Sequence, residues 1–141
     1  MAQQWFRWLI VVMWCIMIFN FTASPTSTSA NTGKIITQET NLPKNEVKQI
    51  NIVVRKNAHV LVFGILALLL WWSNNKKRHS FIIAWFLTTA YAATDEFHQL
   101  YVPNRTASVD DVVLDSFGAF ITLLLVYCLK QKYLKKGNDN R

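Results

Sequence analysis

Four long apolar stretches divide this chain, and polar segments separate them. They cover residues 5–21, 57–72, 81–101 and 109–129. Each approaches the ~20 helical residues that cross a ~30 Å hydrocarbon layer, and none alternates strictly between apolar and polar positions as a half-buried strand does. The pattern therefore predicts an all-α integral membrane protein whose four transmembrane helices form a bundle.

The segment between the first two stretches differs in composition. Ser, Thr and Asn dominate residues 22–32, which favours a flexible loop, and we expect an extracellular Ser/Thr-rich loop over residues 23–44. Apolar residues then recur at helical spacing in residues 45–54, as in a short interfacial helix that leads into the second span. The expected order is a transmembrane helix (1–22), this loop (23–44), a three-helix domain (45–129) and a basic cytoplasmic tail (130–141).

The first stretch has an alternative interpretation. Arg7, the apolar run and the small residues 28–30 resemble a secretory signal with its cleavage site. The run is long for a signal peptide, however, and its three tryptophans are typical of a retained anchor. We therefore expect a retained helix and keep cleavage as the alternative.

Composition and charge agree with a membrane protein. Of the 141 residues, 52% are hydrophobic, and they are concentrated in long runs. The formal net charge of +7 does not indicate nucleic acid, because the basic residues flank apolar runs and form no helical stripe. Cys15 and Cys128 lie inside apolar runs at different expected depths, where they are typical of small packing residues rather than a disulfide.

Basic residues predict the orientation. The positive-inside rule places two basic segments in the cytoplasm, and two spans separate them, so both termini should lie inside. The loop at 23–44 and the polar ends of the spans then face the exterior. The basic residues concerned are Lys76, Lys77 and Arg78 in the turn, and Lys130, Lys132, Lys135, Lys136 and Arg141 in the tail.

Charged residues inside the last three stretches all occur at the same, exterior end. Ionisable groups at membrane depth are costly unless paired or hydrated, so a cluster of them is by default a functional site. At ~1.5 Å per residue, His59, Asp95 and Asp115 lie about 20 to 22 Å above the cytoplasmic ends of their helices. Arg55, Gln99 and Asp111 form a second layer at roughly 25 to 28 Å.

Helical phase also predicts that these groups converge. Three pairs are four residues apart, so each pair shares one face of its helix: Arg55 and His59, Asp95 and Gln99, Asp111 and Asp115. The last face continues through Gly118 and Thr122, where a glycine permits close helix approach. Pro103 and Asn104 end the preceding helix and leave Arg105 on a tight exterior loop.

Together these motifs resemble the VanZ-like family of bacterial membrane proteins over residues 45–129. Two positions differ from the usual pattern: Phe63 stands where Tyr is frequent, and Asn104 stands where Gly is common. The resemblance implies a small multi-pass protein of the bacterial cell membrane, and some members raise resistance to lipoglycopeptides such as teicoplanin. The motifs are Arg55-Lys56-x-x-His59-x-x-x-Phe63, Asp95-Glu96-x-x-Gln99 with Pro103 and Arg105, and Asp111-Val112-x-x-Asp115-x-x-Gly118-Ala119.

The same residues permit structural and functional interpretations. Arg55 and Lys56 either anchor a span at the interface or bind an anionic lipid or lipid-linked phosphate. His59 is either a hydrogen-bonded interhelical residue or an acid–base group or metal ligand. The acidic motif either holds the helices in register or takes part in a ligand site. The predicted ligand-binding residues are Arg55, Lys56, His59, Asp95, Glu96, Gln99, Arg105, Asp111 and Asp115.

Three function classes follow. The first is a non-catalytic envelope protein that binds membrane lipids, a lipid-linked cell-wall precursor or a lipoglycopeptide. The second is an enzyme for lipid phosphate or acyl groups, with His59, Asp95 and Glu96 as candidate catalytic residues. A transporter is disfavoured because no comparable polar residues continue through the inner half of the spans. No cofactor is expected; a divalent ion held by His59, Asp95 and Asp115 is a weaker hypothesis, since no H-E-x-x-H signature is present.

Overall fold

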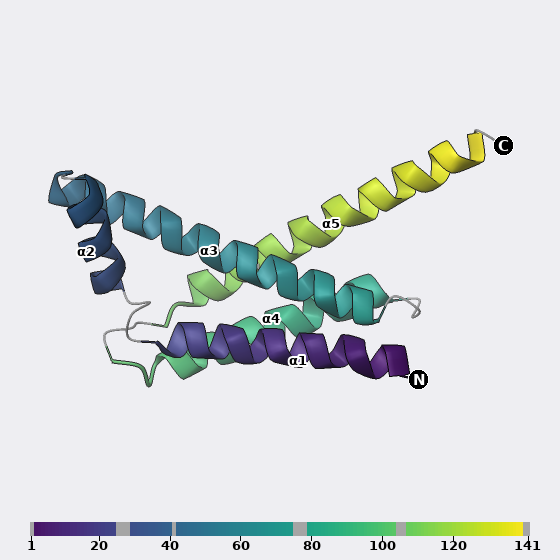
Figure 1. The fold of residues 1–141 in the computed structure, drawn as a ribbon, viewed down its shortest axis with the longest axis horizontal. Coiled ribbons are helices and arrows are strands. Elements are labelled where there is room, and N and C mark those ends of the chain that lie inside the picture. Colours follow the sequence, from purple (N-terminus) through teal and green to yellow (C-terminus); the bar gives the residue numbers. More distant parts are fainter. Residues whose placement is uncertain (1, 25–28, 41, 75–78, 104–106, 140–141) are drawn as a thin grey trace.

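Five helices follow one another along the chain (Figure 1). The computed structural model describes residues 2–24, 29–40, 42–74, 79–103 and 107–139. Within these residues there is no strand, so the predicted all-α fold is confirmed. The helices are α1 (Ala2–Ala23), α2 (Ser29–Thr40), α3 (Lys44–Ser73), α4 (Ser80–Gln99) and α5 (Val109–Asp139).

Three of the described helices are long and apolar enough to cross a membrane. They are α1, α3 and the part of α5 from Val109 to Lys132, with mean hydropathies of 1.8, 1.8 and 2.2 in their most apolar windows. Helix α4 does not qualify by itself, because polar residues including Asp95, Glu96 and Gln99 occupy its last turns. The predicted fourth span is thus present as a helix, although its composition alone does not mark it as a membrane span.

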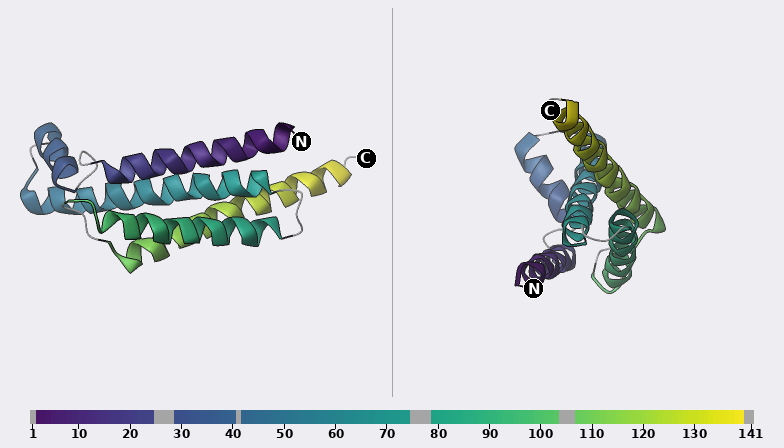
Figure 2. Two further views of the ribbon diagram at one scale, coloured as in Figure 1. Left: turned by 90° about the horizontal axis from the view of Figure 1, so that it is seen from below. Right: turned by 90° about the vertical axis from the view of Figure 1, so that its right-hand side faces the viewer.

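Helix α3 is the centre of the arrangement and contacts each of the other four helices. Helices α1, α3 and α4 run side by side, with α1 packed on both α3 and α4 (Figure 2). Helix α5 packs on α3 and α4 and crosses α3 obliquely, so that its C-terminal half leaves the bundle (Figure 1). The buried apolar core lies between these helices and is formed by Val11, Ile18, Phe63, Leu66, Ala67, Leu70, Ala84, Ala92, Ala119 and Leu123.

The crossing of α3 and α5 depends on two glycines. A Cβ atom on Gly118 would lie 2.8 Å from Cγ1 of Val60, and one on Gly64 would lie 2.8 Å from Oγ1 of Thr122. Both distances are too short for real carbon contacts, so each helix uses a glycine to let the other approach. The close approach predicted at Gly118 is therefore confirmed, and Gly64 supplies its counterpart.

The segment between the first two spans was predicted to be a loop, and this prediction is wrong for its central part. Residues 29–40 form α2, which packs against α3. The side-chain amide of Asn51 donates to the carbonyl oxygen of Ser29 at 2.7 Å and contacts its hydroxyl at 3.0 Å. Tertiary contacts of this kind override the weak local propensity of a Ser/Thr-rich sequence.

Two helices extend beyond the predicted spans. The expected interfacial helix at 45–54 is continuous with the second span, because α3 has 30 residues and a length of about 45 Å. Helix α5 has 31 residues and continues through the basic segment to Asp139. Both are therefore longer than the ~30 Å thickness of a hydrocarbon layer.

Candidate functional site

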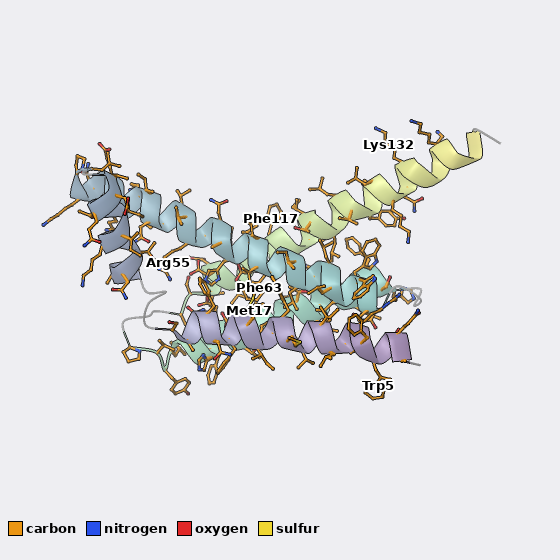
Figure 3. The ribbon with its side chains drawn as sticks, in the orientation of Figure 1. Trp5, Met17, Arg55, Phe63, Phe117 and Lys132 are labelled. Atoms are coloured by element: carbon orange, nitrogen blue, oxygen red, sulfur yellow. The ribbon has the colours of Figure 1, made fainter. Side chains whose placement is uncertain are left out.

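The charged and polar residues gather at one end of the bundle, where α1 and α4 end and α5 begins. Arg55 on α3 lies towards this end, whereas Trp5 and Lys132 lie towards the opposite end (Figure 3). The buried polar side chains at this end come from α1, α4 and α5 and are Thr22, Asp95, Glu96, Gln99 and Asp115. Counting residues along the helices predicted that polar side chains of different helices would lie at one level, and these side chains do gather there.

An ion pair between α3 and α5 forms the first part of the cluster. Nδ1 of His59 lies 3.3 Å from Oδ2 of Asp115. The Asp115 side chain is 1% exposed and that of His59 is 16% exposed. The other carboxylate oxygen of Asp115, Oδ1, is buried and has no hydrogen-bond partner. Since such an oxygen in a buried site is costly, it marks a place where a ligand or water could be bound.

A hydrogen-bond network on α4 forms the second part. The Thr22 hydroxyl of α1 donates to Oδ1 of Asp95 at 2.6 Å, and the Gln99 amide donates to Oδ2 of Asp95 at 2.8 Å. The same amide contacts Oε1 of Glu96 at 3.3 Å, and the backbone N–H of Ser108 donates to Oε2 of Glu96 at 3.0 Å. This network therefore links the end of α1 and the start of α5 through α4.

The two parts are close enough to influence each other. Asp95 and Glu96 interact electrostatically with His59, and Asp111 interacts with both Glu96 and Asp115. Acidic side chains thus outnumber basic ones among the buried residues at this end of the bundle. Among the described residues, the His59–Asp115 contact is the one ion pair. Such a layer of acidic side chains needs positive charge or hydration from its surroundings.

A pocket opens above this layer between α3 and α5. Its volume is about 110 Å³. Arg55, Lys56 and Asp111 line it but make no side-chain hydrogen bond or ion pair with residues that the structure describes. Charged side chains in this state are available to a ligand. The complete lining is Ile52, Arg55, Lys56, His59, Asp111 and Leu114.

Sequence reasoning missed two contributors to the site. Thr22 directly follows the first apolar stretch, so a search for polar residues at the ends of all four stretches would have found it. The Ser108 backbone N–H could not be found from residue types, because every residue except proline has one.

Other predicted residues have different outcomes. Arg105 lies outside the described residues. Phe63 is 1% exposed and stacks on the His59 ring at a centroid distance of 6.0 Å, so this position contributes a carbon edge where a tyrosine would bring a hydroxyl. Phe63 therefore provides an apolar surface on which the His59 ring packs.

The divalent-ion hypothesis finds no support in the described part of the chain. There, no three His, Cys, Asp or Glu side chains are grouped closely enough to hold a metal ion. One reason is visible in the hydrogen bonds, because both oxygens of Asp95 accept from Thr22 and Gln99.

The chain was compared with known proteins. No curated protein matches it, and no solved structure matches it. The sequence profile of the VanZ/LLP1 family matches residues 6–130, which begins within α1 and thus includes the helix that supplies Thr22. The match covers nearly the whole chain and contains all the described residues of the site, and on this basis the protein belongs to the VanZ/LLP1 family.

Proposed function

We propose that this protein binds a lipid-linked or anionic component of the bacterial cell envelope, and that binding lowers susceptibility to lipoglycopeptides such as teicoplanin. The observation that carries the proposal is the pocket between α3 and α5. Two basic side chains, Arg55 and Lys56, line it without a partner among the described residues. A planar guanidinium can bind a phosphate through two parallel hydrogen bonds, which suits an anionic headgroup.

The buried layer supports this binding role. Asp95, Glu96 and Asp115 are 1 to 4% exposed, and hydrogen bonds from other helices hold the first two in place. These acidic groups lie deeper in the bundle than the basic side chains of the pocket, so they disfavour an anion that enters beyond Arg55 and Lys56. A headgroup would therefore rest at the pocket mouth while its acyl chains stay in the bilayer.

The proposal includes a topology with four spans and both termini in the cytoplasm. Helix α4 has 20 residues, a length of about 30 Å, which is sufficient to cross the hydrocarbon layer. Its charged residues are buried against neighbouring helices, so lipid does not meet them. With the positive-inside rule applied to the basic turn and tail, the pocket faces the exterior, where lipid-linked cell-wall precursors and lipoglycopeptides are found.

The proposal can be tested by measuring the teicoplanin susceptibility of cells. We expect cells that express the wild type to tolerate more teicoplanin than cells without the protein, and Arg55→Gln to lose this protection at an equal amount in the membrane. Lys48→Gln is the matched control, because Lys48 is an exposed residue of α3 outside the pocket. Equal susceptibility of wild-type cells and cells lacking the protein would contradict the resistance part of the proposal.

The His59–Asp115 pair favours one alternative, a membrane enzyme that acts on lipid phosphate or acyl groups. A carboxylate that orients an imidazole is a common arrangement for general acid–base catalysis. Purified protein incubated with envelope phospholipids separates the two functions. Release of inorganic phosphate or fatty acid by the wild type, and its loss in His59→Gln, would favour the enzyme; recovery of intact lipid favours binding.

A further inference from the structure

Charges of both signs line the same pocket without neutralising each other. Arg55 and Lys56 belong to α3, and Asp111 belongs to α5. An ion pair between them would be expected if they only joined the two helices. Instead, none of the three has an ion pair or side-chain hydrogen bond with a described residue. The space between them therefore separates a basic wall from an acidic wall.

A second carboxylate, that of Asp115, is buried next to the acidic wall. Asp115 follows Asp111 by four residues and lies on the same face of α5. His59 occupies only its Oδ2, and its Oδ1 is buried without a partner. Asp115 does not itself line the pocket, but its buried carboxylate adds to the acidic character of α5 next to Asp111.

The pocket has room for more than a single ion. Its volume of about 110 Å³ compares with roughly 10–15 Å³ for one water molecule on the same measure. Ile52 and Leu114 add apolar lining beside the charged groups. The dimensions and the lining suit a short headgroup of several heavy atoms that is attached to an apolar chain.

We propose that the ligand carries a phosphate and a primary ammonium group a few bonds apart, as in a phosphoethanolamine headgroup. The phosphate lies against Arg55 and Lys56, and the ammonium donates to the Asp111 carboxylate. A primary ammonium has three N–H donors, whereas a quaternary one has none, so the acidic wall discriminates between them. This inference rests on the proposed function and specifies the chemistry of its ligand.

The test is native mass spectrometry of the full-length protein in detergent micelles, titrated with three phospholipids that have identical acyl chains. Phosphatidylethanolamine carries both groups, phosphatidylglycerol carries only the anion, and phosphatidylcholine carries a quaternary ammonium. Free phosphoethanolamine, as a fourth ligand, distinguishes a soluble headgroup from a lipid. The variants are Asp111→Asn, Arg55→Gln and the matched control Asp110→Asn, whose carboxylate is exposed and outside the pocket.

We expect the wild type to bind phosphatidylethanolamine about tenfold more tightly than the other two lipids, since one charge-assisted hydrogen bond has at least this value. Asp111→Asn should remove this preference and leave phosphatidylglycerol binding unchanged, while Asp110→Asn should behave as the wild type. Stronger binding of the intact lipid than of free phosphoethanolamine would assign the headgroup to a lipid.

Two other results would contradict different parts of the proposal. If the wild type binds phosphatidylglycerol as tightly as phosphatidylethanolamine, or if Asp111→Asn keeps the preference, the ammonium site is wrong, whereas anion binding stands. If Arg55→Gln binds all three lipids as the wild type does, the anionic site is also wrong, and the proposed function fails with it.

Discussion

The two ends of the bundle use polar side chains in different ways. At the end with the pocket, side chains from different helices bond to one another, as in Thr22–Asp95 and His59–Asp115. At the opposite end, they bond to backbone carbonyls or lie over aromatic rings. Gln4 donates to the carbonyl oxygen of Ser73 at 2.6 Å, and Arg7 lies over the Trp72 ring at 4.8 Å.

This difference separates anchoring from ligand binding. A long basic side chain over a tryptophan is the usual arrangement at a membrane interface, and Lys130 above Trp71 repeats it at 5.4 Å. Buried carboxylates below unpaired basic side chains are not needed for anchoring, and they lower stability unless every group is satisfied. The two ends therefore differ in how their polar side chains are held, and the predictions below test the binding role that we propose for the end with the pocket.

The largest expected effect on stability is at Asp95. We expect Asp95→Ala to lower the free energy of unfolding by about 3 kcal/mol, because the Thr22 hydroxyl and the Gln99 amide both lose a buried acceptor. Gln4→Ala, which removes one bond at the opposite end, should cost about 1 kcal/mol. Unfolding by sodium dodecyl sulfate in mixed micelles measures both, and equal losses would contradict the distinction between the ends.

The second largest effect on stability is expected where α3 and α5 cross, because this crossing positions the two walls of the pocket. Gly118→Ala should cost about 2 kcal/mol, since the new methyl group overlaps Val60. Val60→Ala in the same protein should restore most of this loss. Gly33→Ala is the control: its added carbon would lie 3.4 Å from the nearest atom, and we expect no loss of stability. Absence of rescue by Val60→Ala would mean that the two helices do not meet there.

Thr22 tests whether α1 belongs to the site. Thr22→Val keeps the shape and removes the hydroxyl, so we expect a loss of about 1 kcal/mol. The loss should shrink when Asp95 is already alanine, because the acceptor of the Thr22 hydroxyl is then absent. Thr37→Val, at an exposed position of α2, should have little effect. Additive losses for Thr22 and Asp95 would contradict their contact.

The smallest effect is expected at the anchoring end. Lys130→Gln removes a cation from the Trp71 ring at an exposed position, which should cost about 0.5 kcal/mol or less. The same variant should bind phospholipid headgroups as the wild type does. A loss of lipid binding as large as that of Arg55→Gln would show that binding is a property of basic charge anywhere on the protein.

Much of the fold could be predicted because the signals are local. Hydrophobic length identified the four long helices, and helical spacing predicted that the polar groups of three helices would converge, as His59 and Asp115 do. Helix α2 could not be predicted, since it depends on its contact with α3 through Asn51. The extension of α5 was missed because basic residues mark a membrane boundary and do not end a helix.

Partners within the site were harder to predict than its members. The spacing of Asp95 and Gln99 on one helix indicated their contact. It did not indicate that Thr22 of α1 would share the same carboxylate, because the packing of α1 on α4 is a tertiary property. The opposite charges of the pocket walls likewise emerge only when α3 and α5 are placed together.

The central claim is that Arg55 serves a ligand and not the helix bundle. The direct measurement is the affinity of purified Arg55→Gln for phosphatidylglycerol, taken together with its midpoint of thermal unfolding without added lipid. Because Arg55 has no ion pair or side-chain hydrogen bond with a described residue, the account predicts an unchanged midpoint and an affinity at least about tenfold weaker. A clearly lower midpoint with unchanged affinity would show that Arg55 holds the helices together, and would contradict the account.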